Sequence, residues 1–130
     1  MIAGTGIDII SVERIRKIIT RSGDRFLERW FTADEIAYCS AKARPCQHYA
    51  ARMAAKEASV KALRTAWRQK VLFSDVAVAV SENGAPFIKL SGEALRVAKR
   101  AGIDELHLSI SHCAEYAVAS VIAVRNTTHA

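Results

Sequence analysis

The chain has 130 residues, of which 51% are hydrophobic and 25% are charged, and this globular composition excludes a fibrous or disordered protein. No stretch approaches the ~18 consecutive apolar residues of a membrane-spanning helix, and Asp8 interrupts the apolar N-terminal run, unlike a signal peptide. Nineteen Lys and Arg against thirteen Asp and Glu give a net charge of +6, which favours an anionic partner: nucleic acid, a phosphate-bearing cofactor or an acidic protein. We therefore expect a single cytoplasmic domain over residues 1–130, with no membrane partner.

The N-terminal part of the chain predicts a strand followed by a helix. Residues 2–10 are β-branched and contain glycine, which suits a strand with a close backbone approach near Gly4 and Gly6. Ser11 is a suitable N-cap for a helix with isoleucines and a valine on one side. Gly23 then interrupts this helix, and an apolar cluster follows it, made of Phe26, Leu27, Trp30 and Phe31.

Two further helices are predicted before the middle of the chain. Thr32 and Glu35 have the spacing of a capping box, which opens a short helix. After Pro45, the segment from about Gln47 to Trp67 is rich in alanine, carries charges at helical spacing and contains no Gly or Pro. This composition predicts the longest helix of the chain.

The second half of the chain predicts mainly strands. A turn at Asn83-Gly84 separates two short strands, and Gly102 closes a short basic helix. The predicted elements are strands over 76–80, 87–90, 106–111 and 116–124 and a helix over 92–101. The order βαααββαββ indicates an α+β fold with a largely antiparallel sheet and one long central helix.

Two acidic residues in these elements are candidates for chemistry. Glu57 shares one side of the long helix with Met53, Val60, Lys61 and Arg64, and a charge among alanines is costly unless it is paired or holds a ligand. Asp8 interrupts what should be a buried strand. If the two carboxylates converge they would suit magnesium, although Glu57 could equally form a solvated i,i+4 ion pair with Lys61, and Asp8 could cap a helix.

Basic and histidine side chains provide further candidates, each with a plain structural alternative. His112 ends a predicted strand, where a histidine is either structural or a ligand. A series of cations recurs at three- or four-residue steps and forms either a solvated helix face or a docking surface for an acidic helix of a partner protein. This basic stripe consists of Arg14, Lys17, Arg21, Arg25 and Arg29.

Taken together, these residues resemble the holo-acyl-carrier-protein synthase family of 4′-phosphopantetheinyl transferases. The resemblance rests on four blocks that occur in the family's order and span nearly the whole chain. The blocks are Gly6-Ile7-Asp8-Ile9 with Arg14 downstream, Arg29-Trp30-Phe31-Thr32 leading to Glu35, Arg52-Met53-Ala54-Ala55-Lys56-Glu57-Ala58 with Lys61, and Ser109-Ile110-Ser111-His112 before Tyr116-Ala117.

The resemblance implies the fold of these transferases and their reaction. Coenzyme A donates its phosphopantetheine arm to a serine of apo acyl carrier protein, and adenosine 3′,5′-bisphosphate is released. Asp8 and Glu57 would hold Mg²⁺ against the pyrophosphate, and one of these carboxylates or a metal-bound water would accept the serine proton. Lys61 would neutralise or protonate the leaving phosphate. Asp8, Glu57 and Lys61 are therefore the expected catalytic residues.

The resemblance also implies how the two substrates bind. Arg52, Lys56 and His112 would bind coenzyme A, with Arg52 and His112 at its phosphates. Arg14, Lys17, Arg21 and Arg25 would receive the acidic helix of the carrier protein. Members of this family form trimers with active sites between subunits, so we expect a homotrimer in which the strand-rich second half makes the contacts. The expected role is in fatty acid biosynthesis.

One departure from the family pattern lies after the long helix. The family continues K-A-L/F-G-T-G, whereas Arg64 and Ala66 replace the two glycines here. Without glycine we expect no residue of positive φ, and hence a different loop or a longer helix. An active enzyme is favoured because Asp8, Glu57 and Lys61 are retained. The alternatives are a weakened paralogue that still binds carrier protein, and a basic nucleic-acid-binding module, against which the scarcity of stacking aromatics counts.

Overall fold

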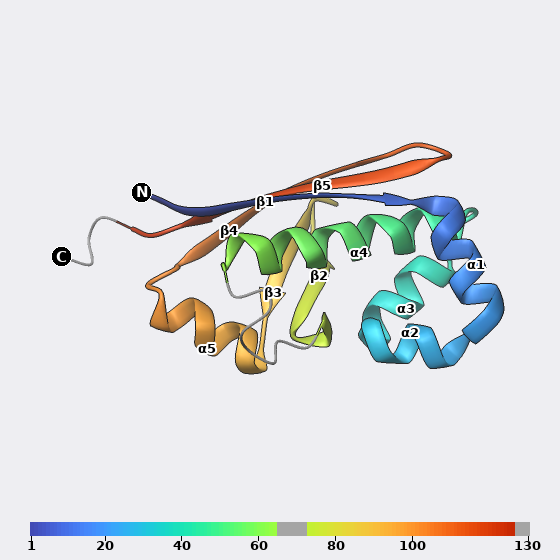
Figure 1. Cartoon of the computed structure of the whole chain (residues 1–130), viewed down its shortest axis with the longest axis horizontal. Helices are drawn as coiled ribbons and strands as arrows, with labels where there is room; N and C mark the ends of the chain where they lie inside the picture. The colour runs from blue at the N-terminus through green and yellow to red at the C-terminus, as the bar shows by residue number, and fades with distance from the viewer. Residues whose placement is uncertain (65–72, 127–130) are drawn as a thin grey trace.

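The computed structural model describes residues 1–64 and 73–126. A three-stranded sheet lies along one side of a long helix, three helices gather at one end, and a hairpin and a further helix lie toward the other end (Figure 1). The elements in chain order are β1 Ile2–Ser11, α1 Val12–Ser22, α2 Asp24–Trp30, α3 Ala33–Ser40, α4 Pro45–Ala62, a 3-10 turn Phe73–Asp75, β2 Val76–Val80, β3 Pro86–Leu90, α5 Gly92–Arg100, β4 Glu105–His112 and β5 Tyr116–Val124. The expected α+β class is confirmed.

The sheet is antiparallel throughout, as the sequence predicts. Its strand order is β1-β5-β4, so the first and last strands of the chain pair along their whole length. Asp8 stands opposite Ala119 in this register, and His112 stands opposite Ala117 on the other side of β5. A separate two-stranded sheet is formed by β2 and β3 around the predicted turn.

The long helix α4 packs on the inner face of the sheet because both surfaces carry small residues. Its alanines at 50, 51, 54, 55, 58 and 62 are almost completely buried. Gly4 and Gly6 of β1 lie directly against it: a Cβ atom at Gly6 would overlap the carbonyl oxygen of Ala58 and lie 3.0 Å from the backbone nitrogen of Ala62. The predicted close approach at these glycines is confirmed.

Predicted caps define the helices at the end of the molecule. The Ser11 side chain accepts a hydrogen bond from the backbone of Arg14 at 3.2 Å and begins α1. The capping box of Thr32 and Glu35 is present at the start of α3. Gly23 ends α1 at a positive φ of 50°, and α2 follows immediately. The sequence did not predict α2, because seven residues are too few to establish a helical period.

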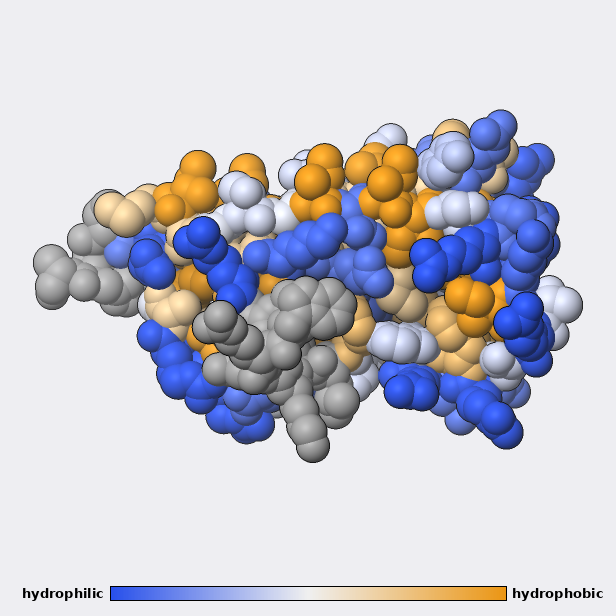
Figure 2. Space-filling model, viewed as in Figure 1, coloured by the Kyte–Doolittle hydropathy of each residue, from blue (hydrophilic) through white to orange (hydrophobic). Residues whose placement is uncertain are grey.

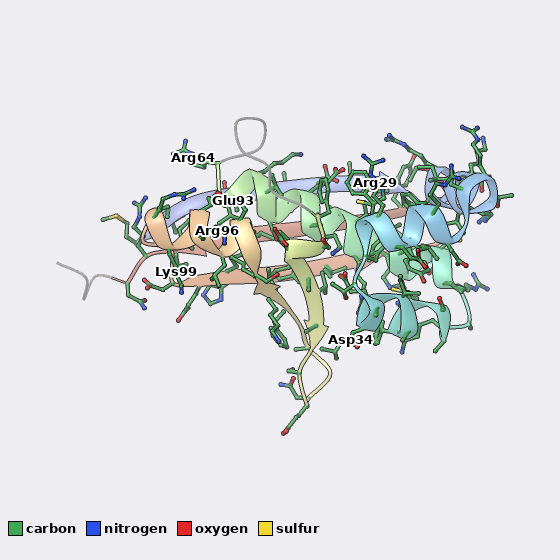
Figure 3. All side chains as sticks on the ribbon, turned by 90° about the horizontal axis from the view of Figure 1, so that it is seen from below. Arg29, Asp34, Arg64, Glu93, Arg96 and Lys99 are labelled. Atoms are coloured by element: carbon green, nitrogen blue, oxygen red, sulfur yellow. The ribbon has the colours of Figure 1, made fainter. Side chains whose placement is uncertain are left out.

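The end of α4 differs from the prediction. The helix begins at Pro45 and ends at Ala62, before the expected end at Trp67, and Ala66 and Trp67 lie outside the described residues. Arg64 has φ +58° although it is not glycine. The expectation that losing a glycine at position 64 would remove the positive φ is therefore wrong: the chain keeps this conformation and an arginine adopts it. Figure 3 shows Arg64 at the end of α4 with its side chain directed away from the body.

Replacing Arg64 with glycine is expected to stabilise the protein. A residue with a Cβ atom costs about 1–2 kcal/mol of stability in the left-handed region. Glycine relieves this strain, but it makes the unfolded chain more flexible and so lowers stability by about 0.4–1 kcal/mol. We expect Arg64→Gly to raise the free energy of unfolding by about 0.5–1 kcal/mol, measured by urea denaturation. Arg64→Ala is the matched control, since it removes the same side chain but keeps the strain. Equal stability of the two variants would contradict this account.

Among the described residues, no helix has both the length and the apolar character needed to cross a membrane.

Candidate functional site

Asp8 and Glu57, which are far apart in sequence, meet between β1 and α4. Both side chains line the same cleft, and they are close enough to hydrogen bond when one of them is protonated. Burial and then the neighbouring Asp8 raise the pKa of Glu57 to about 7, against a smaller lowering by Lys61 and Arg14. The pair therefore holds a proton in mildly acidic solution, and a cation between the carboxylates would relieve their repulsion.

One oxygen of the Asp8 carboxylate accepts no hydrogen bond in the structure. Its Oδ1 atom accepts a hydrogen bond from the Lys61 ammonium at 3.1 Å, whereas Oδ2 is buried without a partner. A buried carboxylate oxygen without a donor is costly. Such an atom beside a second carboxylate fits a hard divalent cation, which takes one or two protein carboxylates and fills its other positions with water or a substrate phosphate. Among the described residues, no group of three or more His, Cys, Asp or Glu side chains is placed to hold a metal ion.

The cleft beside these carboxylates is largely apolar. It has a volume of ≈ 480 Å³ and runs between β1, α1, α2 and α4. Among the described residues of its lining, Arg14 is the one charged residue besides Asp8 and Glu57. The other lining residues are Ile9, Ile10, Ile15, Ile18, Phe26, Trp30 and Met53.

A second group of functional side chains surrounds Arg52. This arginine is only 5% exposed, and its Nε atom is buried without a hydrogen-bond partner. Its guanidinium carbon lies 4.0 Å from the centre of the Tyr38 ring, and the ammonium of Lys42 lies 4.4 Å from the same ring. Arg52 and Tyr38 open onto a cavity of ≈ 490 Å³ between α3 and the β2–β3 hairpin, which also has Lys89 in its lining. A buried cation with an unused donor at a cavity suits an anionic ligand.

His112 belongs to the same group, although it is distant in sequence. Its ring lies 5.1 Å from the ring of His48, and its Nδ1 atom lies 3.2 Å from the side-chain oxygen of Gln47. Burial first, and then the positive charges of His112, Arg52 and Lys42, lower the pKa of His48. We name the set Tyr38, Lys42, His48, Arg52 and His112 the cationic cluster.

The two carboxylates and Arg52 of the cationic cluster line different clefts. In the part of the chain that the structure describes, the cleft of Asp8 and Glu57 and the cavity of Arg52 share no lining residue. Arg52 and Glu57 are five positions apart on α4, which directs their side chains about 140° apart around the helix. A ligand that contacts both sets must therefore reach around α4 or lie between two copies of the chain.

Comparison with known proteins supplies the family. Residues 4–121 match the model of the 4′-phosphopantetheinyl transferase superfamily. This chain belongs to that superfamily. It is similar to the holo-[acyl-carrier-protein] synthases of Koribacter versatilis, with 49% identity over 94% of this chain and 98% of the relative, and of Solibacter usitatus, with 46% identity over the same shares. The resemblance inferred from the sequence is thereby confirmed.

Solved structures of the transferase superfamily have the same fold. The holo-[acyl-carrier-protein] synthase of Neisseria meningitidis is 32% identical, with a TM-score of 0.87 over 96% of this chain and 100% of that protein. The synthase of Helicobacter pylori in complex with coenzyme A is 37% identical, with a TM-score of 0.80 over 92% of this chain and 99% of that protein. The expected transferase fold is confirmed.

Lys56, which the resemblance places at coenzyme A, lies in the interior of this transferase. Its ammonium is fully buried and donates to Glu35 Oε1 at 2.7 Å and to the carbonyl oxygens of Phe73 at 2.9 Å and Val76 at 2.7 Å. All three N–H bonds therefore have partners inside the protein, and none is left for a coenzyme. The contacts of Lys56 in this structure are therefore structural, in place of the coenzyme contact that the resemblance implies.

The basic stripe lies on the helices beside the carboxylate cleft. Arg14, Lys17 and Arg21 line one shallow hollow on α1, and Arg25 follows on α2, after Gly23 has turned the chain. All four of these cations are exposed. The hollow also has Glu13 in its lining, and the exposed cations around it and on α2 carry the charge that an acidic helix would need for docking.

The sequence gives no indication of several residues of the cationic cluster. Tyr38, Lys42 and His48 carry no motif, and they become recognisable only once α3 and α4 pack together around Arg52. The capping box predicts the role of Glu35 at the start of α3, but it does not predict the ion pair of Glu35 with Lys56. Its partner Lys56 lies 21 residues further along the chain.

Proposed function

We propose that this chain transfers the 4′-phosphopantetheine group of coenzyme A to a serine of apo acyl carrier protein in a Mg²⁺-dependent reaction, releasing adenosine 3′,5′-bisphosphate. The observation that carries this proposal is the meeting of Asp8 and Glu57, with an unsatisfied carboxylate oxygen, beside an open cleft. Family membership and the synthase names of relatives at 42–49% identity support it. So do the synthase structures from Helicobacter pylori and Bacillus anthracis in complex with coenzyme A.

Asp8 and Glu57 are the residues that would hold the metal. When bound, Mg²⁺ would draw negative charge from the pyrophosphate bond that breaks. One of these two carboxylates, directly or through a water molecule, would accept the serine proton. Lys61, one turn further along α4, would neutralise the leaving phosphate.

The cationic cluster would bind the phosphates at the nucleotide end of coenzyme A. The buried guanidinium of Arg52 offers an unused donor, and His112 would add a charge-assisted hydrogen bond when protonated. Tyr38 holds Arg52 in place by stacking on it. Removal of either cation should therefore weaken coenzyme binding more than it slows the transfer step.

The separation of the two residue sets supports active sites that are shared between subunits, and the family resemblance implies a homotrimer. One subunit would supply Asp8 and Glu57, and its neighbour would supply Arg52 and His112, so that one coenzyme touches both. The outer face of the three-stranded sheet is unusually apolar: Ile7 is 65% exposed, Ile9 is 64% exposed and Tyr116 is 49% exposed. Figure 2 shows apolar side chains rising along this edge of the molecule, over β1 and β5. Such a face suits burial against other subunits.

The basic stripe would dock the carrier protein. Arg14, Lys17, Arg21 and Arg25 face an acidic helix of the carrier with complementary charge, which raises the rate of association as well as the affinity. The acceptor serine of the carrier protein would then reach the cleft of Asp8 and Glu57, because Arg14 lines both that cleft and the hollow of the stripe. This activity would serve fatty acid biosynthesis in the cytoplasm.

The test is an intact-mass assay with apo carrier protein, coenzyme A and Mg²⁺. We expect the carrier to gain one phosphopantetheine group. Asp8→Asn and Glu57→Gln keep the side-chain shape but should lower the turnover rate by about two orders of magnitude or more. Glu82→Gln, an exposed acid in the turn between β2 and β3, is the control and should be unchanged.

Two results would count against the proposal. Unchanged turnover in Asp8→Asn or Glu57→Gln would remove the metal assignment. Coenzyme binding without any transfer to carrier protein would instead identify a weakened paralogue.

A further inference from the structure

Gln47, in the first turn of α4, contacts the ring of His112, and the function proposed above gives it no role. Its side-chain oxygen lies 3.2 Å from Nδ1 of His112. The two residues are 65 positions apart, so this contact joins the start of α4 to the last residue of β4. Among the described residues, no group hydrogen bonds to the other ring nitrogen, Nε2. Because His112 is an exposed residue, Nε2 is left for a ligand.

The chemistry of the Gln47 oxygen decides which nitrogen of His112 carries the proton. An amide oxygen only accepts hydrogen bonds, so Nδ1 must be the donor in this contact. A neutral imidazole has one N–H, and its other nitrogen is then an acceptor. Neutral His112 therefore presents a lone pair at Nε2, which repels the oxygens of a phosphate. The protonated ring adds a second N–H at Nε2, and only this form donates to a phosphate while the bond to Gln47 is kept.

A second histidine of β4 has the opposite arrangement. The Nε2 atom of His107 lies 3.0 Å from a carboxylate oxygen of Glu105. An ionised carboxylate also only accepts hydrogen bonds, so neutral His107 carries its proton at Nε2. Two histidines of one strand are thus held in opposite tautomers, because their acceptors face opposite nitrogens of the ring. His107 therefore provides an internal reference for His112.

The surroundings of His112 carry positive charge on the helical side. The titratable or charged groups around its ring are Tyr38, Lys42, His48 and Arg52 of the cationic cluster and Cys113 and Glu115 in the turn after β4. Ala117, which stands opposite His112 in β5, brings no charge. The pKa of His48 is lowered, chiefly by burial, so His48 is uncharged at neutral pH.

We propose that Gln47 is a positioning residue: it holds the His112 ring with its proton at Nδ1, so that Nε2 donates to a coenzyme phosphate only when His112 is protonated. The effect on phosphate binding rests on the function proposed above, whereas the tautomer does not. Binding is then coupled to one proton, and the affinity falls as the pH rises through the titration of His112. Without Gln47, neutral His112 can place its proton at Nε2 and still donate, so binding depends less on pH.

Nuclear magnetic resonance of the isotope-labelled full chain tests the tautomer directly. Long-range proton–nitrogen spectra in alkaline solution show which ring nitrogen carries the proton, and His112→Asn assigns the signal. We expect Nδ1–H for His112 and Nε2–H for His107. Gln47→Ala should shift the tautomer ratio of His112 toward Nε2–H by about fivefold, the factor that one hydrogen bond of ordinary strength provides, and should leave His107 unchanged. Gln47→Glu keeps an accepting oxygen and should restore Nδ1–H.

Calorimetric titration with adenosine 3′,5′-bisphosphate, the proposed product, tests the consequence for phosphate binding. Between about pH 6 and pH 8.5, we expect the dissociation constant of the wild type to rise by up to about fivefold more than that of Gln47→Ala. The ligand's own ionisation is the same in both titrations, so the ratio of the two dissociation constants at each pH removes it.

The outcomes separate this inference from the proposed function. If neutral His112 carries its proton at Nε2, or if Gln47→Ala leaves the tautomer ratio unchanged, the inference is wrong, and the function stands as long as the intact-mass assay shows transfer. If the tautomer responds but binding depends equally on pH in both proteins, Nε2 of His112 does not donate to a phosphate, and the link to binding is wrong. Absence of transfer by wild-type protein with the expected tautomer would instead contradict the proposed function and leave the role of Gln47 in holding the ring intact.

Discussion

Gly6→Ala is expected to lower the free energy of unfolding by about 3 kcal/mol, near the upper end of the usual cost of overpacking. The added methyl group would overlap the carbonyl oxygen of Ala58 and lie 2.8 Å from its carbonyl carbon. These are backbone atoms of α4, so no side chain can turn away to make room. The strand must move from the helix, and urea denaturation should detect the loss as a lower midpoint with an unchanged slope.

The same substitution should also impair the site. Asp8 lies two residues after Gly6 on the same face of β1, so a displacement of the strand moves Asp8 away from Glu57. We therefore expect phosphopantetheine transfer by the folded fraction of Gly6→Ala to fall as well, measured at a temperature well below its unfolding transition.

Gly84→Ala is the matched control for this prediction. Gly84 also becomes alanine, but a Cβ atom there meets nothing within 4 Å. Its φ of +85° makes the change unfavourable by about 1 kcal/mol, through backbone strain alone. If Gly6→Ala and Gly84→Ala cost the same, the close contact between β1 and α4 would not be what restricts position 6 to glycine.

Local patterns were enough to predict most elements of this fold. Ser11, Thr32 and Glu35 act at helix starts through hydrogen bonds within three residues, so the sequence contains all the information that they need. The alternation in the second half predicts β2, β3, β4 and β5 to within about a residue, because strands with one buried face repeat every second position. The predicted bounds of α4, about Gln47 to Trp67, differ from the observed Pro45–Ala62, since alanine-rich sequence carries no strong stop signal.

The conformation of Arg64 could not be predicted from propensity. Arginine rarely adopts a positive φ, so the sequence argues for a longer helix or an altered loop. The structure instead ends α4 at Ala62, and the buried Leu63 that follows packs against Val97 and Ala98 of α5. Tertiary packing of Leu63 thus fixes the end of the helix, and Arg64 adopts a strained backbone conformation with positive φ.

The candidate site was predictable in its residue types but not in its geometry. Helical spacing places Glu57 and Lys61 on one side of α4, but it does not say what faces them. Asp8 faces them because Gly6 lets β1 lie against the helix in one register. By contrast, Arg52 and His112 come together through the packing of α3, α4 and β4, which no local pattern encodes.

Lys56→Met is expected to destabilise the protein by about 3–5 kcal/mol, the cost of removing one partner from a buried ion pair. The substitution leaves the Glu35 carboxylate 2% exposed with no compensating cation. It also leaves the carbonyl oxygens of Phe73 and Val76 without the donor that they now share. Burial lowers the pKa of Lys56, and Glu35 opposes this shift, so the two groups depend on each other to remain charged.

This ion pair links four parts of the structure at one point. Lys56 comes from α4 and Glu35 from α3, while Glu35 Oε2 accepts the backbone N–H of Val78 in β2 at 3.0 Å. The 3-10 turn contributes the carbonyl oxygen of Phe73. Loss of the ammonium should therefore loosen the hairpin and the walls of the Arg52 cavity together, and hydrogen exchange at the backbone of Val78 should become faster.

Lys61→Met is the matched control, since it makes the same substitution on the same helix at another lysine paired with a carboxylate. Because the Lys61 side chain is 52% exposed, its loss should change the free energy of unfolding by less than about 1 kcal/mol. The two variants should then separate cleanly: Lys56→Met loses stability, whereas Lys61→Met loses transfer activity and keeps its stability. Equal urea midpoints for the two proteins would show that burial of the Lys56–Glu35 pair does not hold these four elements together.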